Sequence, residues 1–179
     1  MQAPGSSGED RSGGFEGGGW AAPYWEEVMA QVRREAMHAP YDMLFGRKTY
    51  DIFASHFPKA GASPETDMMN AGRKYVVTSN PNGLHWTNST AITGDIPEAV
   101  HGLKAEDGPL LQVHGSGQLI QTLHAHGLID EYRLWTFPVV VGSGKRLFEP
   151  GCGTASLHLE KTEPCSNGVV MSVYRREKQ

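Results

Sequence analysis

This chain of 179 residues has few cysteines, a small net charge and no long apolar run. Cys152 and Cys165 are its only cysteines, which suits a reducing cytoplasm better than a disulfide-stapled fold. The formal net charge of −4 gives no electrostatic support for binding nucleic acid or an anionic membrane. No apolar stretch approaches the roughly 20 residues that a membrane-spanning helix needs. We expect one domain, residues 1–179, with a core of its own and no nucleic-acid or membrane partner.

Metal-binding and common nucleotide-binding motifs are also missing. His124 and His126 are two residues apart and point to different faces of a helix, so no metal site is expected. The dinucleotide fingerprint fails because Ile120 stands where a third glycine or alanine is needed. A Walker loop over Gly142–Lys145 fails because Val139 replaces its first glycine and Arg146 replaces its magnesium-binding Ser or Thr. The two failed nucleotide motifs give no support for a Rossmann dehydrogenase or a P-loop NTPase.

The stretch around which the chain is organised is LLQVHGSGQLIQTLHAH, residues 110–126. It predicts a buried strand, a turn at Gly115-Ser116-Gly117, and a helix that ends before a left-handed Gly127. Glycines let a ligand approach the backbone, and the helix start offers unpaired N–H groups with partial positive charge. The pattern indicates an anion site, with a nucleotide pyrophosphate as its commonest occupant. The alternative is an ordinary tight strand-to-helix turn.

A second junction of this kind follows a short predicted strand, Tyr41 to Phe45. Gly46-Arg47-Lys48-Thr49 leads from this strand into a helix that reaches about His56. Cations have the wrong sign for a helix N-terminus, and a bound phosphate would account for them. The alternative is that both are solvated surface charges.

The remaining segments complete an α/β pattern. Residues 1–22 are rich in glycine and are either a disordered tail or a mobile loop over a site. The other expected segments are a helix from Pro23 to about Met37, a polar connection Pro58–Gly72, a strand Lys74–Ser79, a helix capped by Asp95 and running to about Lys104, a β-rich run Asp130–Val141 interrupted by Pro138, and a hairpin formed by Ser156–Thr162 and Val169–Tyr174 around Asn167-Gly168. We predict a mixed, mainly parallel sheet with helices on both faces and an antiparallel C-terminal strand pair.

Four segments in this order resemble the dihydrofolate reductase-like superfamily, over about Met1 to Arg176. They are LFGRKTYDIF, KYVVTSNP, VHGSGQLIQTL and FPVVVGSGKRLF. The branch they resemble is related to the C-terminal reductase domain of bacterial riboflavin biosynthesis. The resemblance implies that NADPH is the cofactor and that the first three segments bind it.

The resemblance assigns roles to ten residues of the cofactor site. The implied contacts are Gly46, Arg47, Lys48 and Thr49 at cofactor phosphates, with Arg47 near the 2′-phosphate, Thr78 and Ser79 at the adenosine end, and Gly115, Ser116, Gly117 and Gln118 around the pyrophosphate. These roles agree with the residue-level interpretation, because two separate helix starts are each suited to an anion.

The substrate half is less defined by the sequence. None of Asp42, Glu26 and Glu27 maps onto the proton-relay carboxylate of true dihydrofolate reductases. A substrate other than dihydrofolate is therefore favoured. The resemblance implies a pyrimidine or pteridine-like ring, as in the uracil derivative reduced in riboflavin biosynthesis. Trp135 and Thr136 are candidate substrate contacts, with core packing as the alternative for Trp135.

The sequence thus predicts an NADPH-dependent reductase of a small heterocycle, with a homodimer among its expected assemblies. Two alternatives remain open: a catalytically silent NADP-binding protein, and a structural dimerisation module whose glycine turns bind nothing. The resemblance also implies a central first strand that precedes the loop at Met1. We hypothesise that the natural start lies roughly a dozen codons upstream. The alternative is that a strand from elsewhere, or from a second copy, takes that place.

Overall fold

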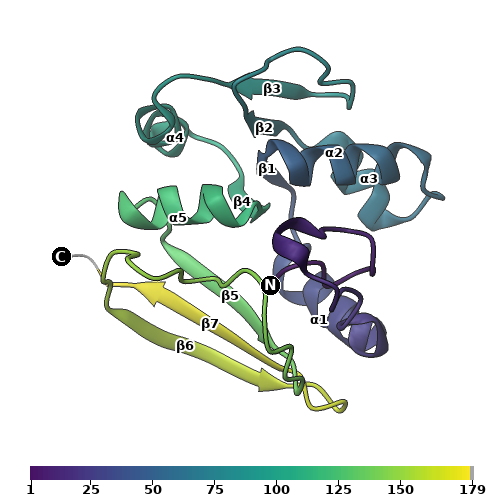
Figure 1. The fold of residues 1–179 in the computed structure, drawn as a ribbon. Coiled ribbons are helices and arrows are strands. Elements are labelled where there is room, and N and C mark those ends of the chain that lie inside the picture. The colour runs from purple at the N-terminus through teal and green to yellow at the C-terminus, as the bar shows by residue number, and fades with distance from the viewer. Residues whose placement is uncertain (178–179) are drawn as a thin grey trace. The chain divides into compact units, whose positions relative to one another are not determined.

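The computed structural model describes residues 1–177, which form two compact units (Figure 1). One unit combines Met1–Glu35 with the chain from Ile129 onward, and we call it the outer-segment unit. The other is the continuous stretch Ala36–Leu128, which we call the central unit. Each unit contains its own β-sheet.

The central unit alternates strands with helices. Its elements are β1 (Tyr41–Gly46), α2 (Arg47–His56), η3 (Phe57–Lys59), α3 (Pro64–Ala71), β2 (Lys74–Val77), β3 (Ser89–Ile92), α4 (Ile96–Ala105), β4 (Leu110–Gly115) and α5 (Gly117–Ala125). Its four strands are all parallel, in the order β3-β2-β1-β4, and helices flank the sheet (Figure 1). Because β1 and β4 are parallel neighbours, their carboxyl ends meet at one edge of the sheet.

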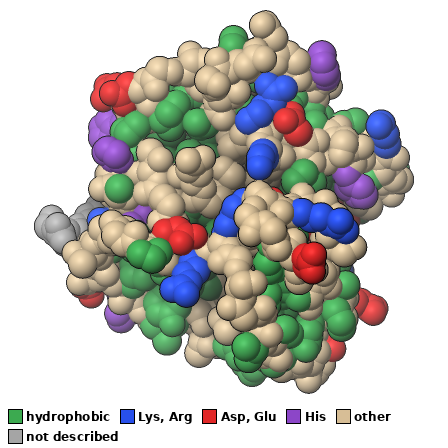
Figure 2. Space-filling view, viewed as in Figure 1, with side chains coloured by type: hydrophobic (Ala, Val, Ile, Leu, Met, Phe, Trp, Pro, Cys, Tyr) green, Lys and Arg blue, Asp and Glu red, His purple; other side chains and the backbone are tan. Residues whose placement is uncertain are grey.

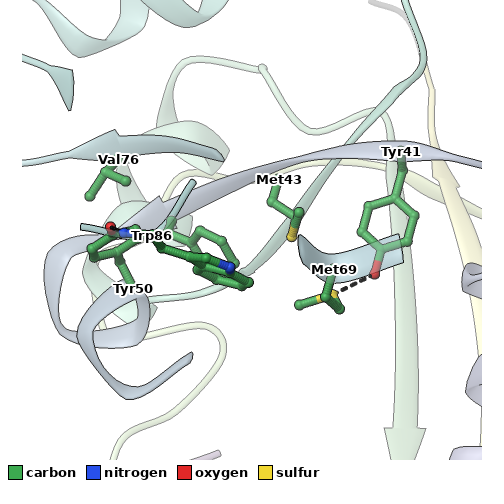
Figure 3. Close-up of a cluster of buried hydrophobic side chains, with 7 residues drawn as sticks. Tyr41, Met43, Tyr50, Met69, Val76 and Trp86 are labelled. Carbon is green, nitrogen blue, oxygen red and sulfur yellow. Dashed lines mark hydrogen bonds between the residues drawn. The ribbon is translucent and has the colours of Figure 1, made fainter. Parts of the chain in front are cut away.

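The core of the central unit forms against β1. Tyr41, Met43 and Phe45 alternate along β1 and therefore share one face, where they pack with Tyr50, Met69, Val76 and Trp86 (Figure 3). The Tyr41 hydroxyl donates to the Met69 sulfur at 3.0 Å, and its burial raises the pKa of Tyr41 to about 12. Leu44, on the opposite face, is also fully buried, so β1 is covered on both sides as a central parallel strand requires.

Lys74 is an unusual member of this interior, because its side chain is fully buried. Its ammonium donates to the carbonyls of Asn70 at 2.6 Å and Thr87 at 3.1 Å. It also lies 4.4 Å from the centre of the Trp86 ring, as a cation–π contact. Desolvation by burial lowers the pKa of Lys74 to about 8.

Two features of the central unit differ from the sequence prediction. Residues 58–72 were expected to be a polar connection, but they contain η3 and α3. Ser63 caps α3 by accepting from the N–H of Thr66, and Pro64 occupies the first helical turn, so local capping chemistry stabilises this short helix. Strand β3 was not predicted, because Ser89–Ile92 has no apolar alternation to reveal it.

The outer-segment unit carries the antiparallel part of the fold. Its elements are η1 (Ser12–Gly14), η2 (Ala22–Tyr24), α1 (Trp25–Ala36), β5 (Glu131–Thr136), β6 (Leu157–Pro164) and β7 (Val170–Arg176). The strands pair in the order β5-β7-β6 and form a sheet separate from the parallel one. The predicted hairpin is confirmed, and β5 adds a third strand that ends before Pro138. The α/β fold class is confirmed, with its parallel and antiparallel strands in two sheets.

The interpretation of residues 1–22 as a disordered tail is wrong. Gln2 is buried, and its side-chain amide donates to the carbonyls of Asp10 and Ser12. The Trp20 indole donates to the carbonyl of Gln2, and Phe15 is 6 % exposed. Burial of these aromatic rings offsets the entropy of ordering a glycine-rich segment.

Charges on the surface are mixed in sign. Figure 2 shows Lys and Arg side chains interspersed with Asp and Glu on the face in view. Within residues 1–177, no helix has both the length and the apolar character to cross a membrane. The same residues contain no cluster of three or more His, Cys, Asp or Glu side chains that could hold a metal ion.

Candidate functional site

Two strand-to-helix junctions lie side by side at the carboxyl edge of the parallel sheet. At the first, β1 ends at Gly46 and α2 begins at Arg47; at the second, β4 ends at Gly115 and α5 begins at Gly117. Phe45 is the register partner of Gly115, so the two junctions are neighbours across the β1–β4 ladder. The carboxyl edge of a parallel sheet is where open α/β folds bind their ligands.

The two junctions pack into each other through glycine. A side chain at Gly46 would overlap the hydroxyl oxygen of Ser116 and place its Cβ 2.9 Å from the Ser116 Cβ. A side chain at Gly115 would place its Cβ 2.9 Å from the hydroxyl oxygen of Thr49, and Gly115 has a φ of +131°. Each glycine therefore faces a hydroxyl residue of the other junction. The two junctions can come this close only because glycine has no side chain.

Both helix starts also lack the groups that normally satisfy a helix N-terminus. Neither Gly46 nor Ser116, the N-cap residues of α2 and α5, makes a side-chain cap hydrogen bond within the described residues 1–177. Neither first turn contains an acidic residue. In contrast, Ser63 caps α3 and Asp95 caps α4, and both of these helices have acidic first turns. The N–H groups left available at α2 and α5 form an electropositive edge suited to anions.

Two cations flank this edge at the start of α2. Arg47 donates from Nε to Asp51 and from Nη1 to the carbonyls of Asn80 and Asn82. The Lys48 side chain is exposed, and it makes no hydrogen bond or ion pair in the part of the chain that the structure describes. Of these two cations, Lys48 is therefore the one that no protein group in residues 1–177 neutralises.

The predicted adenosine-end residues follow β2 at the same edge. The Thr78 hydroxyl accepts from the N–H of Asn80 at 3.1 Å and lies at the same distance from the Asn80 carbonyl. Thr78 therefore shapes the turn that Arg47 anchors. Ser79 is exposed beside it, and Gln118 is exposed in the first turn of α5. All ten predicted cofactor residues lie in the central unit.

The predicted substrate residues belong to the outer-segment unit. Trp135 is half-buried, and its indole donates to the side-chain oxygen of Gln31 on α1 at 2.9 Å. This contact supports the packing role that was the alternative for Trp135. Thr136 is exposed at the end of β5.

Two of the three carboxylates considered as proton donors, Glu27 and Asp42, accept hydrogen bonds from neighbouring protein groups. Glu27 accepts from the Ser166 hydroxyl at 2.6 Å and from the N–H of Asn167 at 3.2 Å. Asp42 accepts from the N–H of Arg73 at 3.2 Å, before β2 begins and thus at the opposite edge of the sheet. Both carboxylates hold local structure.

Two residues near the site were missed from the sequence. Asp51 holds Arg47 one helical turn along, and the i,i+4 spacing of opposite charges is the signal that could have revealed it. His114 directly precedes the second junction, and its ring lies 5.6 to 6.0 Å from the rings of Tyr41, Phe45 and Phe53. These rings desolvate the imidazole and lower its pKa, although the exposure of the same side chain to water limits that effect.

Neither of two cavities found within residues 1–177 is lined by residues of these junctions. A cavity of about 40 Å³ borders Asp42, Arg73 and Tyr75 at the amino edge of the parallel sheet. It is far smaller than the roughly 300–1,000 Å³ of typical ligand pockets. A larger one of about 320 Å³, in the outer-segment unit, lies between Phe15 and Lys145. The candidate site is formed by the backbone of the two junctions and by the cations of α2.

Comparison with known proteins gives the family. The RibD C-terminal domain family matches residues 5–171, nearly the whole chain. The chain belongs to the RibD C-terminal domain family. Its Bacillus subtilis relative YyaP, an uncharacterised protein, is 34% identical over 137 residues, which cover 74% of this chain and 72% of YyaP. A second uncharacterised Bacillus subtilis protein, YwjB, is 28% identical over 101 residues, covering 56% of this chain and 58% of YwjB.

Solved structures support the same fold. A putative riboflavin biosynthesis protein from Shewanella sp. PV-4 superposes with a TM-score of 0.62 at 23% identity, covering 79% of this chain and 77% of that one. A pyrimidine reductase-like protein from Corynebacterium diphtheriae gives a TM-score of 0.63 at 13% identity, covering 89% and 85% of the two chains. The RibD C-terminal domain family is reductase-like, which confirms the resemblance seen in the sequence.

Proposed function

We propose that this protein is an NADPH-dependent reductase that transfers a hydride to a small heterocycle. The observation that carries the proposal is the pair of uncapped, acid-free helix starts whose glycines interlock at one sheet edge. Leaving two helix N-termini unsatisfied costs stability, and a bound anion at each would recover it.

The chemistry of the edge fits NADPH. This cofactor carries a pyrophosphate and a separate 2′-phosphate, and the edge offers two separate sets of N–H donors. The start of α5, from Gly115 to Gln118, would hold the pyrophosphate. The start of α2, with Arg47, Lys48 and Thr49, would hold the 2′-phosphate side, and the turn at Thr78 and Ser79 would border the adenosine.

In this proposal the protein binds NADPH and orients it. Bound NADPH would supply the hydride. The backbone at Gly115–Gly117 would fix the pyrophosphate, and the cations of α2 would fix the other end of the cofactor. Holding both ends positions the reactive ring for transfer, which is how proteins contribute to cofactor chemistry.

A pyrimidine or pteridine-like ring is the substrate that we propose. The solved relatives include a pyrimidine reductase-like protein and a putative riboflavin biosynthesis protein, and such rings are flat and rich in hydrogen-bonding groups. Thr136 is exposed and could meet a substrate, whereas Trp135 is held by Gln31. We also propose a cytoplasmic location and assembly as a homodimer.

Two measurements test this function. The first is a fluorescence titration with NADPH, for which saturable binding is expected; its absence would favour the structural dimerisation module. The second is NADPH oxidation with a panel of oxidised pterins, pyrimidines and flavins. Turnover of one class is expected, whereas binding without turnover of any of them would identify a catalytically silent NADP-binding protein.

A further inference from the structure

Asp51 fixes the guanidinium of Arg47 along one side. The Arg47 Nε donates to both carboxylate oxygens of Asp51, at 2.9 and 3.1 Å. The two residues are one helical turn apart on α2, so the pair forms without any contribution from a distant segment. An exposed pair of this kind adds little stability, so stability is a weak reason for its presence.

The loop after β2 fixes the guanidinium along a second side. Nη1 donates to the carbonyls of Asn80 at 3.0 Å and Asn82 at 3.1 Å. The loop is itself held by the Asn82 N–H, which donates to the side-chain oxygen of Asn80 at 3.0 Å. Because a guanidinium is planar and rigid, contacts through Nε and Nη1 also set the direction of Nη2.

Nη2 is the part of Arg47 that remains available. It makes no hydrogen bond to any group within residues 1–177. Gly83 lies next to it: a Cβ at Gly83 would be 3.4 Å from Nη2, and the φ of Gly83 is +78°. A glycine in this left-handed conformation keeps the approach to Nη2 free of a side chain.

We propose that Asp51 is a positioning residue for cofactor discrimination: it holds Arg47 so that Nη2 faces the 2′-phosphate that distinguishes NADPH from NADH. This rests on the proposed function. Arg47 is pre-organised to present the N–H donors of Nη2 to one partner, and a ligand that lacks the 2′-phosphate gains nothing from this arrangement.

Electrostatics and positioning predict opposite effects of removing Asp51. If Asp51 only neutralised Arg47, then Asp51→Asn would raise the positive charge at the site and tighten NADPH binding. If Asp51 positions Arg47, Asp51→Asn would weaken NADPH binding, because the freed guanidinium must be ordered again on binding. NADH binding would change little in the second case.

The test is calorimetric titration of the full chain and its Asp51→Asn variant with NADPH, NADH, adenosine 2′,5′-bisphosphate and AMP. We expect the NADPH-over-NADH preference to fall about fivefold or more in Asp51→Asn, entirely through weaker NADPH binding. The preference for the bisphosphate over AMP should fall in parallel, and this pair reports on the 2′-phosphate without the nicotinamide. Asp67→Asn, which removes the same charge from an exposed position on α3, should leave both preferences unchanged.

A mutant cycle separates positioning from simple charge. Asp51→Ala should lower the preference in wild type but not in an Arg47→Ala background, because Asp51 acts through Arg47. Asp51→Glu should restore part of the preference. Tighter NADPH binding by Asp51→Asn, or an additive double mutant, would overturn the inference. Equal wild-type affinity for NADPH and NADH would also overturn it while leaving a reductase in place, whereas absence of any nucleotide binding would reject the proposed function itself.

Discussion

The Ser116 side chain lies where a side chain at Gly46 would be, although the two residues are 70 positions apart in the sequence. The hydroxyl of Ser116 fills the volume that a side chain at Gly46 would need. Gly46→Ala should therefore push the two junctions apart, with a cost of about 1–3 kcal/mol in unfolding free energy and a marked loss of NADPH affinity. Ser116→Gly in the same chain removes the obstructing atoms and should restore both quantities in part. Chemical denaturation and NADPH titration measure the two effects, and failure of Ser116→Gly to rescue would refute this packing relationship.

Replacement of Gly117 by a large residue should prevent NADPH binding. Valine in the first turn of α5 would stand where the pyrophosphate approaches the backbone, so Gly117→Val should abolish detectable binding. Thr78→Val should lose only part of the affinity, because Thr78 shapes a turn rather than the phosphate cradle. Gly102→Val, on a helix of the same unit with open space around it, is the matched control and should bind NADPH normally. Tight binding by a folded Gly117→Val would place the pyrophosphate elsewhere.

Lys48 should lower the stability of α2 and raise the affinity for NADPH. Reversal of its charge in Lys48→Glu suits the dipole of α2 and should leave the unfolding free energy unchanged or raise it by about 0.3–1 kcal/mol. The same change should weaken NADPH binding by about tenfold or more, because an attraction to phosphate becomes a repulsion. Thermal melting and titration of Lys48→Glu, with exposed Lys59→Glu as control, compare the two effects. A Lys48→Glu protein that binds NADPH normally would show that Lys48 is only a surface charge.

Lys74 should make stability rise with pH in the alkaline range. Its pKa falls from 10.5 to about 8 on folding, so between these values the unfolded chain binds more protons than the folded one. The penalty for burying the charged form is complete below pH 8 and disappears as the pH approaches 10.5. Between pH 7.5 and 9.5 this contributes up to about 2 kcal/mol of added stability, reduced by the carbonyl and ring contacts that favour the ammonium.

Denaturant unfolding of wild type and Lys74→Met at these two pH values measures the contribution. The variant should lack the rise. The range stops short of pH 10 because Tyr41, whose pKa is raised to about 12, lowers stability above that point. A rise of equal size in both proteins would assign the effect to another group.

The sequence predicted the elements that contain a clear local signal, such as an apolar run or a capping residue. Strand β1, the cap at Asp95 and the left-handed Gly127 are confirmed. Strand β4 is confirmed as a strand but not as a buried one, because it lies at the edge of the parallel sheet and its Leu110 is 55% exposed. The sequence did not predict α3, whose apolar content is little more than Met68 and Met69, or β3, which has a single large apolar residue, Ile92. Strands this short are defined by their neighbours in the sheet, and a sequence pattern contains no record of those neighbours.

Some features of the candidate site could also be predicted from local sequence, and others could not. The glycines and cations were predictable, because helix starts that bind phosphate need particular residue types. The contact between Gly46 and Ser116 was not, since it depends on the pairing of β1 with β4. The expected first strand before Met1 and the expected homodimer stay predictions.

Titration of the wild-type chain and Gly117→Val with NADPH, followed by fluorescence, tests the central claim most directly. The claim is that the paired helix starts of α2 and α5 bind the phosphates of NADPH. We predict saturable binding by wild type, tighter for NADPH than for NADH, and none by a folded Gly117→Val protein. Wild-type protein that binds no NADPH, or a Gly117→Val variant that binds it as tightly as wild type, would contradict the account.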